Sequence, residues 1–239
     1  MVFIPFVSGR ILDPLGEPLD GKPAPRYEDR LSSSIFHVSG PPTTHRVPSK
    51  GAFPSGVRSL DAFRPIVRGR SVALTGNTGQ GQREFALQLI THLSSCQRGM
   101  VELREALEGA SSAGAAKATL GKPLRWVYIS VGHSARKTAE TVEALWASGG
   151  SAFGTAVVAD STSPVGLQWM APLAGISLAE AWRSVGDDVV VVLDDLATHL
   201  EIARQCVETT FAMSFFLCPS PCPKPCKPGL VVWHFFLLA

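Results

Sequence analysis

The chain has 239 residues, of which 45% are hydrophobic and 18% charged, a composition that is ordinary for a globular protein of one or two domains. A formal net charge of +2 at pH 7 is too small to indicate a nucleic-acid partner. No apolar run approaches the length of a membrane-spanning helix, so we expect no direct membrane insertion. The first residues, MVFIPFVSGR, have no basic residue before the apolar part, and we expect neither a signal peptide nor a transit peptide.

The amino-terminal part of the chain is rich in residues that favour turns. It begins with GRILDPLGEPLDGKP from Gly9 to Pro23, and several prolines and many Ser and Thr residues follow in Ala24–Phe53. Because proline fixes φ and removes a backbone donor, we expect a mostly irregular connector in this second stretch.

Strand-like and helix-like patterns then alternate along the middle of the chain. Such alternation predicts an α/β fold with a mostly parallel sheet that is covered on both faces, and its ligands are expected at the carboxyl ends of the strands, where Gly76 and Asp194 lie. Glu105–Gly121 is Ala-rich without an apolar stripe, and we interpret it as a surface insertion. The expected strands are Ser71–Thr75, Trp126–Val131, Phe153–Ala159 and Val189–Leu193, and the expected helices are Arg83–Ser95, Ala135–Trp146 and Leu178–Val185.

A degenerate phosphate-binding loop follows the first of these strands. The segment from Gly76 to Arg83 reads GNTGQGQR, whereas a functional P-loop reads GxxxxGK[ST]. Gly76 and Gly81 stand where the pattern requires glycine, but Gln82 replaces the lysine and Arg83 replaces the Ser or Thr. The backbone and the helix N-terminus still favour an anion, but the ammonium for the β- and γ-phosphates and the hydroxyl for Mg²⁺ are missing. The alternative is a tight turn that the fold alone requires.

Two aspartates follow the most apolar strand of the chain, VVVVL at Val189–Leu193. Asp194 occupies the position of the acidic residue that contacts Mg²⁺ through water in P-loop proteins. The alternative for an aspartate after a strand is a turn or a helix cap. We expect Asp194 to descend from a metal site and Asp195 to cap the next helix.

The five cysteines do not indicate a disulfide framework, and we expect Cys96 and Cys206 to be buried, reduced thiols. Cys218, Cys222 and Cys226 are spaced by four residues, with a histidine further on. Structural zinc sites prefer a CxxC spacing, and prolines flank all three of these cysteines, so we do not predict a zinc site.

The segment after Gln205 has a different composition. Five prolines in Pro219–Pro228 exclude a helix or a central strand there. We expect an irregular, disordered tail and no core strand beyond Leu193. The uncharged segments FAMSFFL and LVVWHFFLLA favour aggregation, so removal of everything after Gln205 is expected to improve solubility and leave the sheet intact.

Taken together, four segments resemble the F-type ATP synthase alpha subunit, in the order of that family. The likeness ends at Gln205. It covers roughly the middle part of the family's sequence. The resemblance implies a RecA-like P-loop NTPase core with a mostly parallel sheet, preceded by a remnant of the amino-terminal barrel and followed by an irregular tail. The four segments are GRILDPLGEPLDGKP, GVRSLDAFRPIVRGRSVALTG, WVYISVGHSARKTAETVEAL and GLQWMAPLAGISLAEAWRSVGDDVVVVLDDLATHLEIARQ.

The resemblance also implies a division into domains and a set of ligands. Residues 1–55 correspond to the barrel exit and connector, 56–205 to the nucleotide-binding core, and 206–239 to a tail foreign to the family. ATP or ADP and Mg²⁺ are the implied ligands, weakened or lost here. His133 stands where alpha subunits have Gln and catalytic beta subunits have Glu, and we expect it to be a solvent-exposed turn residue. The implied nucleotide-binding residues are Gly76, Asn77, Thr78, Gly79, Gln80, Gly81, Gln82 and Arg83, with Asp194 as a water-mediated Mg²⁺ ligand and no catalytic residue.

The function that the resemblance implies is that of an alpha-subunit-like component of a proton-transporting ATP synthase. Its ATP site is expected to be non-catalytic and impaired, and its implied partners are the beta subunit and the other ring subunits. The implied location is peripheral to the mitochondrial inner membrane, with a plastid or bacterial membrane as alternatives. Two other interpretations stay open: a paralogue that binds no nucleotide and has a structural or assembly role, and a truncated gene product without function.

Overall fold

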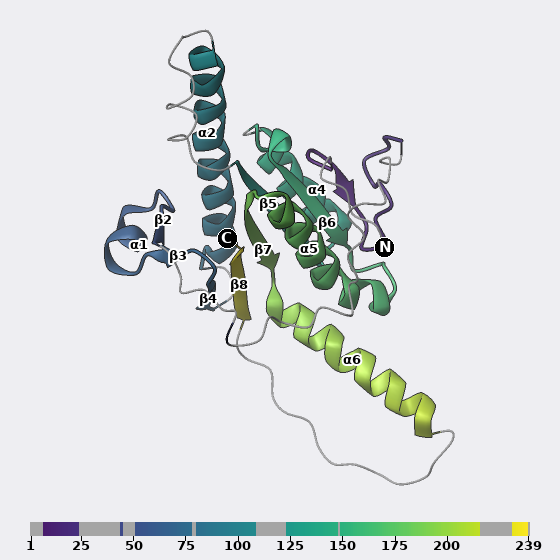
Figure 1. The fold of residues 1–239 in the computed structure, drawn as a ribbon. Coiled ribbons are helices and arrows are strands. Elements are labelled where there is room, and N and C mark those ends of the chain that lie inside the picture. Colours follow the sequence, from purple (N-terminus) through teal and green to yellow (C-terminus); the bar gives the residue numbers. More distant parts are fainter. Residues whose placement is uncertain are drawn as a thin grey trace.

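A six-stranded sheet forms the centre of the computed structural model (Figure 1), which describes residues 7–23, 44, 51–77, 80–108, 123–147, 149–215 and 231–238. The strands lie in the order β1-β6-β5-β7-β8-β4. The first four are parallel to one another, whereas β8 is antiparallel to both of its neighbours. The strands are β1 (Ile11–Leu12), β4 (Ser71–Gly76), β5 (Leu124–Val131), β6 (Gly154–Ala159), β7 (Asp188–Asp194) and β8 (Val231–Leu238).

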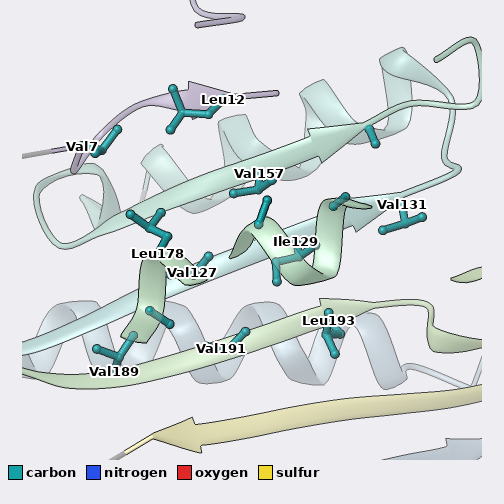
Figure 2. Packing of buried hydrophobic residues seen from close by; sticks show 14 of the residues in the cluster. Val7, Leu12, Val127, Ile129, Val131, Val157, Leu178, Val189, Val191 and Leu193 are labelled. Atoms are coloured by element: carbon teal, nitrogen blue, oxygen red, sulfur yellow. The ribbon is translucent and has the colours of Figure 1, made fainter. Parts of the chain in front are cut away.

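Alternate residues of the central strands point to opposite faces of the sheet, as the pleat requires. One face packs against α5 (Val165–Val185), and Figure 2 shows the apolar residues of β5, β6 and β7 that line this layer. The other face packs against α2 (Gln82–Glu108) and α4 (Ala135–Ala147). On that second face lie Trp126 and Tyr128 of β5 and Val190 and Val192 of β7.

The helix α5 lies very close to the sheet because of one glycine. A Cβ atom added to Gly175 would lie 2.3 Å from Cδ1 of Ile129 on β5. Any side chain at this position would therefore push α5 away from the strand. Helix α6 (Leu196–Phe215) follows β7 directly and contributes Ile202 to the same apolar cluster.

A small unit lies beside the lower part of α2 in Figure 1. It consists of the antiparallel strands β2 (Ala52–Phe53) and β3 (Ile66–Val67), with α1 (Arg58–Phe63) between them in sequence. Outside this unit, a short 3-10 helix, η3 (Gly150–Ala152), precedes β6. Arg68, just after β3, forms an ion pair with Asp188 at the start of β7. The unit is thus joined to the amino-terminal end of β7, at the end of the parallel strands opposite their carboxyl ends.

The predicted α/β fold with a mostly parallel sheet is confirmed, and each expected strand is present. Two helices are longer than their periodicity predicted: α5 begins at Val165 rather than Leu178, and α2 continues to Glu108, into the expected insertion. The first half of α5 contains a proline and two glycines, which lower helix propensity, but burial of this segment against the sheet outweighs that cost. The rest of the insertion lies outside the described residues.

The expectation that no sheet strand follows Leu193 is wrong. Helix α6 continues past Gln205 to Phe215, and β8 pairs with β7 on one side and with β4 on the other. Proline excludes a helix or a central strand only in Pro219–Pro228, which lies outside the described residues. The sequence of β8, VVWHFFLL, is instead rich in β-branched and aromatic residues that favour a strand. The domain limits at residues 55/56 and 205/206 remain predictions.

None of the helices in the part of the chain that the structure describes is long and apolar enough to cross a membrane.

The position of β8 reverses the expected effect of removing the tail. Truncation after Gln205 is now expected to lower the thermal unfolding midpoint, because β4 loses the strand that joins it to β7. Phe235→Pro, at a position that pairs with Val192 and Val72, tests the same point with one substitution. An unsatisfied buried backbone group costs about 1–3 kcal/mol, which corresponds to a fall of roughly 2–12 °C for a chain of this size.

Circular dichroism measures the midpoint, and Ser220→Pro, inside the proline-rich stretch, is the matched control that should leave it unchanged. A truncated chain that keeps the full midpoint and stays soluble would show that the sheet does not need β8.

Candidate functional site

The loop after β4 and the end of β7 lie at the same edge of the sheet. Both strands are antiparallel to β8, so they run in the same direction and their carboxyl ends, at Gly76 and Asp194, come to one edge. Helix α2 begins at Gln82, directly after the loop. Of the predicted loop residues, Thr78 and Gly79 lie outside the described residues.

Two glutamines of the loop bond to the backbone of Asn77. The backbone N–H of Asn77 donates to Oε1 of Gln80 at 3.1 Å, and Nε2 of Gln82 donates to the Asn77 carbonyl at 3.0 Å. A Cβ atom on Gly76 would lie 2.4 Å from Nε2 of Gln82, and Gly81 has a φ of +88°, in the left-handed region. A phosphate bound here would have to displace the Gln80 side chain from the Asn77 amide.

Arg83 does not line this loop. Its side chain, only 12% exposed, reaches from the first turn of α2 into the layer between the helices and the sheet. There Nη2 lies 2.5 Å from Oγ1 of Thr141 on α4, 3.3 Å from the Tyr128 hydroxyl on β5 and 3.1 Å from Oδ2 of Asp194 on β7. One guanidinium nitrogen therefore connects α2, α4 and two strands.

Arg83, Tyr128 and Thr141 form a polar cluster around Asp194, whose side chain is fully buried. Its place follows from the alternation along β7: Val190 and Val192 face α2 and α4, and Asp194 is the next residue in that series. Oδ2 accepts a hydrogen bond from the Tyr128 hydroxyl and pairs with Arg83, whereas Oδ1 has no hydrogen-bond partner. A buried carboxylate requires such compensation, because an uncompensated charge inside a protein is strongly destabilising.

The environment of Tyr128 fixes its protonation state. Burial, and then the negative charge of Asp194, raise the pKa of the phenol well above its ordinary value of 10.0, and the Arg83 charge only partly opposes this. The hydroxyl therefore remains a donor to Asp194 at neutral pH. Neither Tyr128 nor Thr141 was predicted as a site residue. For Tyr128, the only signal in the sequence is its polar hydroxyl, on the face of the sheet to which Asp194 also belongs.

His133 is not the solvent-exposed turn residue that we expected. The chain turns at Gly132, with a φ of +69°, and brings the imidazole inward until only 12% of the side chain is exposed. Its Nε2 lies 3.2 Å from Oδ2 of Asp194 without forming a hydrogen bond. The sequence could not reveal this contact, which depends on how the loop after β5 folds over the end of β7.

The expected cap of α6 is confirmed. Asp195 accepts hydrogen bonds from the backbone N–H of Thr198 at 3.0 Å and from its hydroxyl at 2.6 Å, and adopts a φ of +70°. The expectation of two buried thiols is wrong for Cys96, which is exposed, while Cys206 is half-buried. The Cys96 thiol is free, and Sγ of Cys206 lies 3.9 Å from the Val165 carbonyl oxygen. The other three cysteines lie outside the described residues.

The residues present do not fit a Mg²⁺ ion beside Asp194. Magnesium requires several oxygen ligands in near-octahedral geometry. In this chain an arginine stands at the hydroxyl position, Oδ2 of Asp194 already faces that arginine, and Oγ1 of Thr141 donates to the Lys137 carbonyl at 2.8 Å. Within the described ranges, no group of three or more His, Cys, Asp or Glu residues could hold a metal ion.

Comparison with known proteins agrees with the sequence segments noted above. Residues 56–210, more than half of the chain, match the family described as ATP synthase alpha/beta family, nucleotide-binding domain. ATP synthase subunit alpha 1 of Hahella chejuensis is 30% identical over 197 residues, which are 82% of this chain and 34% of the relative. ATP synthase subunit alpha of Aquifex aeolicus is 28% identical over 197 residues, 82% of this chain and 33% of the relative. The chain spans about a third of the length of the curated relatives it matches.

The raised pKa of Tyr128 gives a prediction that needs no ligand. The chain has two tyrosines, so Tyr27→Phe leaves Tyr128 as the only one. In this variant the ultraviolet absorbance of phenolate is expected to be absent near pH 10 and to rise only as the fold is lost. The folded state binds this proton more tightly than the unfolded state does. The stability that the tighter binding of this proton contributes is therefore complete below pH 10.0. It is lost as the pH rises through the higher pKa that Tyr128 has in the folded state.

A second substitution, Asp194→Asn, removes the nearby negative charge and should bring the titration to lower pH. Normal ionisation near pH 10 in a Tyr27→Phe chain that is still folded by circular dichroism would contradict the buried contact.

Proposed function

The chain belongs to the ATP synthase alpha/beta family, and from this membership we propose that it is an alpha-subunit-like component of a proton-transporting ATP synthase with a weakened, non-catalytic nucleotide site. The observation that carries the proposal is Gln82. It stands at the lysine position of the P-loop, and its amide is held on the Asn77 carbonyl. The loop therefore has a neutral amide where a functional P-loop has an ammonium group.

The weakening has two sources in the loop. A charge-assisted hydrogen bond to phosphate, one of the strong kinds, is replaced by a neutral amide. In addition, the Asn77 amide that would bind phosphate is already occupied by Gln80. What remains favourable is the N-terminus of α2, whose dipole attracts anions, and the open turn at Gly81.

The proposal of a non-catalytic site rests on His133, at the place where the family's catalytic subunits carry a glutamate. Hydrolysis of a nucleotide needs a group that orients the attacking water. His133 stands at the expected place for such a group and lies against Asp194 instead. Asp194 is itself engaged by Arg83 and Tyr128.

The partners and location remain family-based proposals. We propose ATP or ADP as the ligand, and the beta subunit with the other ring subunits as partners. The proposed location is peripheral to the mitochondrial inner membrane, or to a plastid or bacterial membrane. Exposed apolar side chains on two separate elements, Phe63 on α1 and Leu200 and Val207 on α6, are compatible with contacts to neighbouring subunits.

A second candidate function is that of a paralogue that binds no nucleotide and serves structure or assembly. The observation that favours it is the same loop, in which the side chains of Gln80 and Gln82 both bond to the backbone of Asn77. Binding measurements on reverted variants separate the two functions.

The double substitution Gln82→Lys, Arg83→Thr is expected to strengthen Mg-ATP binding by roughly ten- to a hundred-fold. It returns the phosphate counter-charge and the metal-binding hydroxyl, and a hydrogen bond to a charged group contributes about 1.5–3 kcal/mol. Isothermal titration calorimetry on the full chain measures the dissociation constant.

Gln88→Lys, combined with the same Arg83→Thr change, is the matched control, because it places the lysine at an exposed position further along α2 and should give no such gain in affinity. Micromolar binding by the unmodified chain would contradict the weakened site. A folded double variant without any gain would favour the structural paralogue.

A further inference from the structure

We infer that Arg83 is the resident cation of this site: its guanidinium occupies the place beside Asp194 that a divalent metal would take, so that the site is metal-independent. The inference deepens the proposed function, since it concerns what the degenerate site uses instead of Mg²⁺. It rests on the geometry of the cluster formed by Arg83, Tyr128, Thr141, His133 and Asp194.

The ion pair is built into the interior rather than resting on the surface. The Asp194 side chain is fully buried and that of Arg83 is 12% exposed, with 3.1 Å between Nη2 and Oδ2. The contact joins the first turn of α2 to the end of β7, two elements that are distant in sequence. Solvent screening, which makes exposed ion pairs weak, is small at such a site.

The charges at the cluster are already balanced. Asp194 contributes one negative charge and Arg83 one positive charge, and Tyr128 and Thr141 are neutral hydroxyls. The imidazole of His133, which also faces Asp194, adds no negative charge. A divalent cation would therefore meet no net negative charge, and would approach a guanidinium in a medium of low dielectric constant.

The oxygen atoms that a metal needs are also engaged. Oδ2 of Asp194 accepts from Tyr128 and pairs with Arg83, and Oγ1 of Thr141 accepts from Arg83 while donating to Lys137. Among the described carboxylate and hydroxyl oxygens of this cluster, only Oδ1 of Asp194 has no hydrogen-bond partner. A single carboxylate oxygen cannot provide the coordination shell of Mg²⁺.

The test uses Mn²⁺ as the probe and the full chain as it is. Electron paramagnetic resonance measures bound Mn²⁺, and circular dichroism measures the unfolding midpoint in EDTA and in MgCl₂. The unmodified chain is expected to bind no Mn²⁺ at this site and to have the same midpoint in both solutions. Arg83→Thr is expected to lower the midpoint in EDTA by on the order of 10 °C, because it leaves Asp194 uncompensated. MgCl₂ should restore part of that loss, and Mn²⁺ should bind.

Further variants at Arg83 and Asp194 keep the result decisive. Arg83→Lys retains a positive charge and should still exclude Mn²⁺. If Arg83→Thr does not fold, Arg83→Gln, Asp194→Asn and the double variant give a thermodynamic cycle. The double variant should then unfold at a higher temperature than either single variant, because it leaves no unpaired charge.

Three results would overturn the inference. They are Mn²⁺ binding by the unmodified chain that Asp194→Asn abolishes, an Arg83→Thr midpoint equal to that of the unmodified chain, and strictly additive losses in the cycle. Neither ATP nor a partner subunit enters these measurements. A failure of the proposed function in calorimetry and a failure of this inference are therefore distinguishable.

Discussion

The buried ion pair between Arg83 and Asp194 is the interaction on which the organisation of the site depends. β7 is buried along its whole length and ends in a carboxylate on the face covered by α2 and α4. That charge cannot reach water, so a cation has to come to it. Arg83 provides this cation from α2, and in doing so links the start of the helix to the hydroxyls of Tyr128 and Thr141.

The fold could be predicted from sequence to the extent that its patterns are local. The run VVVVL and the alternation of strands and helices depend only on neighbouring residues, and they predicted the parallel sheet. The position of β8 depends on pairing with β4 and β7, which precede it by many residues, and no periodicity within the tail reports it. Helix α5 shows the same limit, because its amino-terminal half is stabilised by burial against the sheet rather than by its own helix propensity.

The site was predictable as a location and not as a set of contacts. Comparison with the P-loop pattern showed which groups were missing at Gln82 and Arg83, but a motif cannot show where a substituted side chain goes. Gln82 turns back onto Asn77 within the loop, whereas Arg83 leaves the loop for Asp194. Burial of His133 could not be foreseen for the same reason, since it follows from the meeting of two strand ends that are far apart in sequence.

The two departures from the P-loop pattern therefore act in two different places. Gln82 bonds locally to the Asn77 carbonyl, and Arg83 reaches across the fold to Asp194. Gly81 has a use here that needs no ligand, because it holds a left-handed turn. A Cβ atom at Gly76 would meet only the ends of the flexible Gln80 and Gln82 side chains, so the two glycines do not by themselves support nucleotide binding. The lysine and hydroxyl positions decide that question, because those side chains supply the charge and the metal ligand that the backbone cannot replace.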